Sequence, residues 1–307
     1  MSATLHQMHG CLDRYRSLPS TLQRSLQLVY ERQGKLGQGS PERLLEILDS
    51  LTPWQMLTDK WIDKLPCYSH NGQTIRLLSF LKDSKSVKVL SGVIEGPSPR
   101  SVVVKYISSR KHTIEDEIGH YQKLDKMGCS LPWYSADFFY WNTRVLVLEK
   151  LEPLGPYEDE YQVGRQILRQ LRYLHHYGCH SDIKPPNIMK RKRKGGKGRY
   201  DYFLIDYGGV ATVPLKEGYK RWIWTEKWSS QEPHVKNQVI TPTQDFIELA
   251  YVMRVIQNWR EQPPSKKGRY SDGSFKDLKY RGRLKKYITL VNRGCLDHKE
   301  LIMVLRD

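Results

Sequence analysis

The spacing of apolar residues changes twice along this chain, and the two changes limit the folds that it can adopt. Between about residue 71 and residue 150, apolar and polar residues alternate in three runs, at 74–81, 87–94 and 101–107. A period of two is typical of half-buried β-strands, and the polar connections KDSKS and EGPSPR predict an antiparallel meander. Beyond residue 151, apolar residues recur every three or four positions, which is the period of amphipathic helices.

The remaining segments extend this pattern. Helical spacing also occurs before the strands: Ser20, Ser40-Pro41 and Thr52-Pro53 mark three helix starts within the first seventy residues. Further helices are predicted at 113–127, 160–177, 243–259 and 284–304, and further strands at 144–150, near Ile188 and at 202–205. The sequence therefore predicts an α+β fold: a helical N-terminal extension over 1–70, a β-rich lobe over 71–150 and a mainly helical lobe over 151–307.

Composition indicates an intracellular chain with acidic partners. No run of about 18 apolar residues occurs, and the first thirty residues lack the apolar stretch of a signal peptide. The five cysteines have no C-x-x-C spacing, so neither a zinc site nor a disulfide framework is indicated. Fifty Lys plus Arg against thirty-three Asp plus Glu give a formal charge of +17. This surplus favours nucleic acid, phosphoproteins or anionic membrane, although it also serves solubility.

Two neighbouring motifs carry the chemistry. HSDIKPPN covers residues 180–187, and LIDYGG follows at 204–209. Phosphoryl transfer needs a group that orients the attacking hydroxyl, cations that neutralise phosphate charge, and oxygen ligands that hold those cations. Asp182 suits the first role and Lys184 the second, while Asn187 and Asp206 can hold magnesium.

These motifs resemble those of protein kinases, whose catalytic loop reads H-x-D-x-K-P-x-N and whose metal motif reads D-F-G. The Lys-Pro pair after Asp182 resembles the serine/threonine branch. Tyr207 in place of Phe is similar to the vaccinia-related kinases, and VLVLEKLEP at 145–153 is similar to the casein kinase one group. The resemblance implies a bilobal, ATP- and magnesium-dependent transferase that phosphorylates protein hydroxyls. The sequence is divergent within that branch, and a viral origin is one interpretation.

The resemblance also assigns residues outside the two motifs. Lys105 in VVVKY matches the lysine that binds the α- and β-phosphates, and Glu117 matches its helix partner, with Glu115 and Asp116 as alternatives. The backbone from Glu149 to Leu151 would bind adenine between the lobes. Farther along, Glu232 resembles the glutamate of A-P-E, and Asp245 resembles the aspartate that opens the helix supporting the catalytic loop.

One departure leaves a second function open. The loop expected to cover the phosphates, KDSKSV at 82–87, contains no glycine, although glycine lets backbone N–H groups approach phosphates closely. The alternative to an enzyme is therefore a pseudokinase, a binding or scaffolding protein of the same fold. A small-molecule phosphotransferase is a third interpretation, against which Lys184-Pro185 and Glu232 count.

The basic run KRKRKGGKGR has no role in that chemistry. Residues 190–199 contain seven basic side chains, and Gly195-Gly196 suits a tight turn between two strands. A cluster of this kind serves either as a nuclear import sequence or as a phosphate-binding patch for nucleic acid. It therefore predicts a protein of the cytoplasm, the nucleus or both. A solvated loop without a partner is the alternative.

Overall fold

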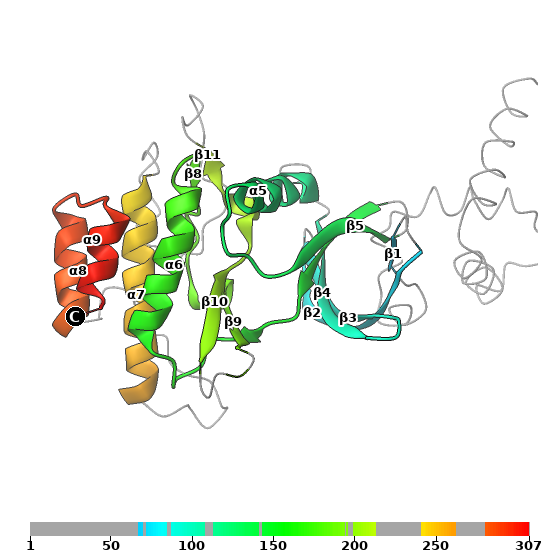
Figure 1. Cartoon of the computed structure of the whole chain (residues 1–307), viewed down its shortest axis with the longest axis horizontal. Coiled ribbons are helices and arrows are strands. Elements are labelled where there is room, and N and C mark those ends of the chain that lie inside the picture. The colour runs from blue at the N-terminus through cyan, green and yellow to red at the C-terminus, as the bar shows by residue number, and fades with distance from the viewer. Residues whose placement is uncertain are drawn as a thin grey trace, which may run out of the picture. The chain divides into compact units, whose positions relative to one another are not determined.

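The computed structural model describes residues 67–69, 72–84, 87–107, 113–140, 143–193, 195, 199–212, 241–261 and 280–306. They belong to two units (Figure 1). The first contains the described residues up to Ile114 together with Trp133–Lys150, and the second contains Glu115–Pro132 and the residues from Leu151 onwards. The predicted helical extension lies outside the described residues except at its end, where Cys67–Ser69 form a strand.

The first unit is a closed antiparallel barrel of six strands in the order β1-β2-β3-β4-β6-β5. The meander predicted from the alternating runs is confirmed as β2, β3 and β4, and the strand predicted at 144–150 is β6. The strands are β1 (Cys67–Ser69), β2 (Thr74–Asp83), β3 (Val87–Ile94), β4 (Arg100–Ile107), β5 (Tyr134–Tyr140) and β6 (Thr143–Glu149). Strand β1 pairs with both β2 and β5, so it closes the barrel.

Alternation along β3 and β4 separates the barrel core from the opposite face. Leu90 lies opposite Val104 in the ladder, and both side chains are 1% exposed. The next residue of β4, Lys105, points to the other face because successive strand residues alternate in direction. A buried leucine side chain contributes roughly 1.5–3 kcal/mol relative to an exposed one. The barrel interior is therefore the main source of stability in this unit.

We expect Leu90→Ala to lower the free energy of unfolding of the first unit by about 3 kcal/mol, because it leaves a cavity in the barrel core. Leu78→Ala on β2 is the matched control, since the Leu78 side chain is 44% exposed, and it should cost less than about 1 kcal/mol. Urea unfolding followed by circular dichroism measures both values. Equal losses would contradict this description of the core.

The second unit is mainly helical and carries two small sheets. Its strands pair in the orders β10-β9-β7 and β11-β8. Its helices are α5 (Ile114–Lys126, whose first residue belongs to the first unit), α6 (Glu160–Leu174), α7 (Pro242–Glu261), α8 (Gly282–Asn292) and α9 (His298–Val304). Its strands are β7 (Glu152–Pro153), β8 (Gly178–Cys179), β9 (Ile188–Lys192), β10 (Tyr200–Leu204) and β11 (Ala211–Thr212).

Helix α6 is central to this unit. The Asp159 side chain caps it by accepting hydrogen bonds from the backbone N–H groups of Tyr161 and Gln162. Its apolar stripe is buried as the sequence predicts, and α7 packs on it. Gly164 permits the close approach, because a Cβ at this position would overlap the side chains of Met253 and Leu305.

Two glutamines of α6 pair with the backbone of β10. Gln166 accepts from the Tyr202 N–H at 3.0 Å and donates to the Tyr200 carbonyl at 3.2 Å. One turn later, Gln170 accepts from the Leu204 N–H at 3.0 Å and donates to the Tyr202 carbonyl at 2.8 Å. The two side-chain amides thus satisfy backbone N–H and carbonyl groups along one edge of β10, as another strand would.

The α+β fold is confirmed: an antiparallel β-rich unit and a mainly helical unit. The lobe boundaries at residues 71 and 151 stay predictions. No helix among the described residues is both long and apolar enough to cross a membrane.

Candidate active site

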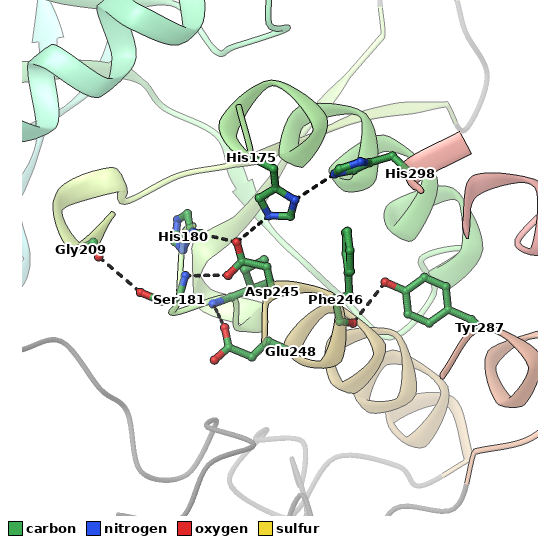
Figure 2. Close-up of polar contacts among 10 residues, drawn as sticks. His175, His180, Ser181, Gly209, Asp245, Phe246, Glu248, Tyr287 and His298 are labelled. Atoms are coloured by element: carbon green, nitrogen blue, oxygen red, sulfur yellow. Dashed lines mark hydrogen bonds and ion pairs between the residues drawn. The ribbon is translucent and has the colours of Figure 1, made fainter. Parts of the chain in front are cut away.

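The catalytic-loop residues predicted from HSDIKPPN lie between β8 and β9, and two carboxylates of α7 hold their backbone (Figure 2). Asp245 accepts hydrogen bonds from the N–H groups of His180 at 2.8 Å and Ser181 at 2.7 Å. Glu248 accepts from the N–H of Ile183 at 2.8 Å. Residues three apart on a helix share one face, so both carboxylates reach the same loop. Asp245 lies in the first turn of α7, at the opening of the helix, as the sequence predicts.

The Asp245 carboxylate is fully buried and charged. Burial alone would raise its pKa, but the hydrogen bonds from His175 and from the Ser181 amide outweigh burial and hold the pKa below its ordinary value. The His175 Nε2 atom lies 2.9 Å from Asp245 Oδ2. A charge-assisted hydrogen bond is about twice as strong as a neutral one, so this carboxylate is a firm anchor for the loop.

Ser181 has a left-handed backbone, with φ of 59°. A non-glycine residue in this region is strained by roughly 1–2 kcal/mol. The bond from its own N–H to Asp245 stabilises this conformation, and its hydroxyl lies 3.4 Å from the Gly209 carbonyl. Asp245 thus stabilises the strained backbone immediately before Asp182.

Asp182, Lys184 and Asn187 meet at one point, as the motif predicts. The Lys184 ammonium lies 2.6 Å from Asp182 Oδ2. The Asn187 amide nitrogen donates to the Asp182 carbonyl at 2.9 Å and approaches Asp182 Oδ2 at 3.4 Å. The short 3-10 turn Pro185–Asn187 brings the asparagine back toward the aspartate. A carboxylate, a cation and a carboxamide therefore share one buried cluster.

Asp206 is tied to this cluster through the backbone. It follows β10 and is left-handed, with φ of 69° and ψ of 58°. The Ile205 N–H donates to the Asn187 carbonyl at 2.9 Å, and the Ile205 carbonyl lies 3.1 Å from His180 Nε2. Both sides of Ile205 are thus fixed to the catalytic loop, which places Asp206 next to Asn187.

Glu117 and a group of aromatic rings in edge-on contact lie beside Asp206. Tyr121 of α5 packs edge-on against Tyr207 at 4.9 Å between ring centroids, and Tyr207 packs against His180 at 5.5 Å. Burial raises the pKa of the Tyr207 phenol well above its ordinary value, so it stays neutral. A Cβ added at Gly208 would lie 3.1 Å from Glu117 Oε2, so this glycine leaves room for the buried carboxylate.

Two of the predicted nucleotide residues belong to the first unit. Lys105 pairs with Val89 in the β3–β4 ladder and is 7% exposed. The Glu149 N–H donates to the Trp133 carbonyl at 2.9 Å, and the Glu149 carboxylate accepts from the Trp133 N–H at 3.2 Å. The side chain of Glu149 therefore braces the chain at the end of β6, and its N–H is already used.

In the glycine-free segment, of which 82–84 and 87 are described, hydrogen bonds between Ser84 and Val87 close a turn. Ser84 donates through its N–H and its hydroxyl to the Val87 carbonyl at 3.1 and 2.8 Å, and its hydroxyl accepts from the Val87 N–H at 3.1 Å. Lys88 and Asp83 flank the turn as an ion pair at 2.8 Å. The N–H groups of Ser84 and Val87 are used within the turn.

The structure brings together four of the predicted site residues, Asp182, Lys184, Asn187 and Asp206, and places Glu117 beside Gly208, all within the second unit. Lys105 and Glu149 belong to the first unit, and Leu151 begins a stretch of the second. Glu232 lies outside the described residues. Sequence reasoning missed His175, Glu248, Gln166 and Gln170. The Asp245-x-x-Glu248 spacing was a usable signal for Glu248, because it puts two carboxylates on one helix face.

A solved structure described as vaccinia related kinase 3 is similar at 15% sequence identity, over 78% of this chain and 88% of that chain, with a TM-score of 0.48. No protein-family model matches the chain, and no curated protein matches it.

Two half-buried imidazoles should make stability fall in mild acid. Burial lowers the pKa of both His120, which stacks on Tyr177, and His298 to about 4. The unfolded chain, with an ordinary histidine pKa, then binds more protons than the folded chain between about pH 6.5 and pH 4. We therefore expect the Tm to fall as the pH drops through this window.

Thermal unfolding across that pH range measures this effect. His120→Phe should flatten the dependence in part, because it removes one of the two groups. His176→Gln is the matched control at an exposed position. A Tm that stays constant from pH 6.5 to pH 4 would show that neither imidazole is held neutral by the fold.

Proposed function

We propose that this chain is a serine/threonine protein kinase that transfers the γ-phosphate of ATP to hydroxyl groups of other proteins. The observation that carries the proposal is the buried cluster of Asp182, Lys184 and Asn187, with Asp206 tied next to it. Phosphoryl transfer depends on positioning and electrostatic stabilisation, and this cluster supplies the groups that such positioning requires.

The donor atoms suit magnesium. The Asn187 amide nitrogen faces Asp182, which leaves its carboxamide oxygen to ligate a cation, and Asp206 offers a carboxylate. Magnesium prefers oxygen ligands of this kind and keeps several waters and phosphate oxygens. When bound, it would neutralise charge on the phosphates. We therefore propose Asn187 and Asp206 as the metal ligands.

Asp182 is the proposed catalytic carboxylate. It would accept a hydrogen bond from the substrate hydroxyl, orient its oxygen toward the phosphate and take up its proton. The Lys184 ammonium, which pairs with Asp182, would move toward the transferring phosphate and offset its charge. The anchor on α7 fixes the backbone on both sides of Asp182 before any substrate binds.

The proposed nucleotide contacts are Lys105, for the phosphates, and the backbone from Glu149 to Leu151, for adenine. Because the Glu149 N–H is used by Trp133, the Glu149 carbonyl and the Leu151 N–H are the groups proposed for adenine. Glu117 is proposed to belong to the same site. The serine/threonine preference rests on Lys184-Pro185, and the nearest kinases proposed are the casein kinase one and vaccinia-related group.

Asp182→Asn should reduce turnover at least about 100-fold while the affinity for ATP with magnesium stays nearly unchanged, because only the proton acceptor is lost. Asp206→Asn should weaken magnesium-dependent ATP binding as well as turnover. Phosphate transfer to a generic protein substrate and ATP-induced thermal shifts measure the two effects. Asp137→Asn, an exposed change on β5, is the control. Full turnover by both site variants would contradict the proposal that the chain is an enzyme.

A pseudokinase is the second candidate, and the turn at 82–87 favours it. The N–H groups of Ser84 and Val87 are bonded within the turn, so they are not offered to phosphates as in a glycine-rich loop. Absence of an ATP-induced thermal shift in the wild-type protein with magnesium would favour this second function over the first.

We also propose that the basic hairpin of β9 and β10 directs the protein to the nucleus or to nucleic acid. Where the hairpin is described, Lys190, Arg191 and Arg193 have local partners. Lys190 lies 2.5 Å from Glu158 and is 14% exposed, Arg191 stacks over Phe203, and Arg193 lies 2.6 Å from Asp201. The proposal therefore concerns the other basic residues of the run, which are Lys192, Lys194, Lys197 and Arg199, with Lys194 and Lys197 outside the described residues.

Replacing these four residues with Gln should abolish nuclear accumulation of a tagged protein or flatten the salt dependence of its DNA binding. Phosphate transfer to a short peptide should survive, since none of the four lies in the proposed active site. Lys190→Gln is the contrasting variant. This variant should lower the free energy of unfolding, because it leaves the buried Glu158 carboxylate without its ammonium partner. If location and DNA affinity are both unchanged, the hairpin is a solvated loop without a partner.

A further inference from the structure

A chain of hydrogen bonds connects helix α9 to the catalytic loop (Figure 2). His298 Nε2 lies 2.9 Å from His175 Nδ1, and His175 Nε2 lies 2.9 Å from Asp245 Oδ2. Asp245 in turn accepts from the N–H groups of His180 and Ser181. The last helix of the chain is therefore two side chains away from the backbone that carries Asp182.

Protonation fixes the direction of these bonds. A charged carboxylate only accepts hydrogen bonds, so His175 Nε2 carries a proton and donates it to Asp245. In neutral His175, Nδ1 then has no proton and accepts from His298 Nε2–H. Asp245 therefore selects the tautomer of His175, and the His298 Nε2–H is the donor that this tautomer accepts.

Packing holds the two imidazoles in this geometry. Phe246 meets both rings nearly edge-on, with centroids 5.2 Å from His175 and 5.2 Å from His298. Helix α9 is itself fixed, because Leu301 is buried and Arg165 of α6 donates to the Leu305 carbonyl at 2.6 Å. His298 is thus presented by a rigid element, as a positioning side chain should be.

We propose that His298 is a positioning residue for the catalytic loop. By donating a hydrogen bond to His175, it holds the imidazole that donates to Asp245, and so keeps the Asp245 carboxylate in place to bind the His180 and Ser181 amides. Where it concerns turnover, this proposal rests on the proposed function. Its effect on the loop backbone is independent of whether the chain is an enzyme.

Two variants at this position separate the hydrogen bond from packing. His298→Gln places an amide N–H close to where Nε2–H lies, so it keeps a donor for His175. His298→Leu has similar bulk against Phe246 and removes the donor. Leu301→Ala is the control, because it loosens α9 without removing the donor.

Backbone hydrogen exchange of the peptide covering residues 178–183 is the first measurement. We expect exchange roughly tenfold faster in His298→Leu and within about twofold of wild type in His298→Gln. Phosphate transfer is the second. We expect kcat to fall roughly tenfold in His298→Leu, with an unchanged KM for ATP, and to recover in His298→Gln.

Exchange at 178–183 that is unchanged in His298→Leu, or altered equally in His298→Gln and His298→Leu, would overturn the proposal and leave His298 a packing residue. So would loop exchange that rises as much in Leu301→Ala as in His298→Leu. A wild-type protein that transfers no phosphate would refute the proposed function alone, since the exchange measurement still decides the role of His298.

Discussion

The structure of the second unit depends on one buried carboxylate. Removing a charge from water is costly unless hydrogen bonds replace its hydration, and Asp245 receives three such bonds, from His175, His180 and Ser181. In return, it fixes two successive amides of the loop, one of them that of Ser181, whose backbone is left-handed. That strain persists because the surrounding hydrogen bonds over-determine the backbone.

The other reactive groups are placed relative to this anchor by backbone contacts. Asn187 bonds back to Asp182 through its side chain and forward to Ile205 through its carbonyl, so the catalytic loop and the end of β10 form one assembly. The glutamines of α6 fix β10 from its other edge. A side chain on a well-held backbone loses little entropy on binding its target, which is the physical basis of preorganisation. The candidate site is therefore held in place by the fold itself.

Sequence patterns predicted the elements with strong local periodicity and missed those without it. Strands β2 to β4 alternate cleanly, and α6 has a continuous apolar stripe. Strand β5 was missed because register shifts between Ser135 and Phe138 break its alternation, and β1 because three residues show no period. The cluster of Asp182, Lys184 and Asn187 was predictable because its members lie within six residues of one another.

Contacts between distant segments had no such signal. A glutamine on an amphipathic helix gives no sign that it will pair with a strand, yet Gln170 meets Tyr202 and Leu204 more than thirty residues later. In the same way, the basic run at 190–199 gives no sign that Lys190 pairs with Glu158, which lies before α6. The glycine-free turn was visible in the sequence, whereas its closure by the Ser84 hydroxyl was not.

The central claim is that the Asp245 anchor makes a working phosphotransfer site. Asp245→Asn tests it most directly, because the amide keeps the shape of the side chain and loses the charge. We predict that the folded variant binds ATP with magnesium within about threefold of wild type, while turnover of a protein substrate falls at least about 100-fold. Turnover within about threefold of wild type, or a wild-type protein with no magnesium-dependent turnover, would contradict the account.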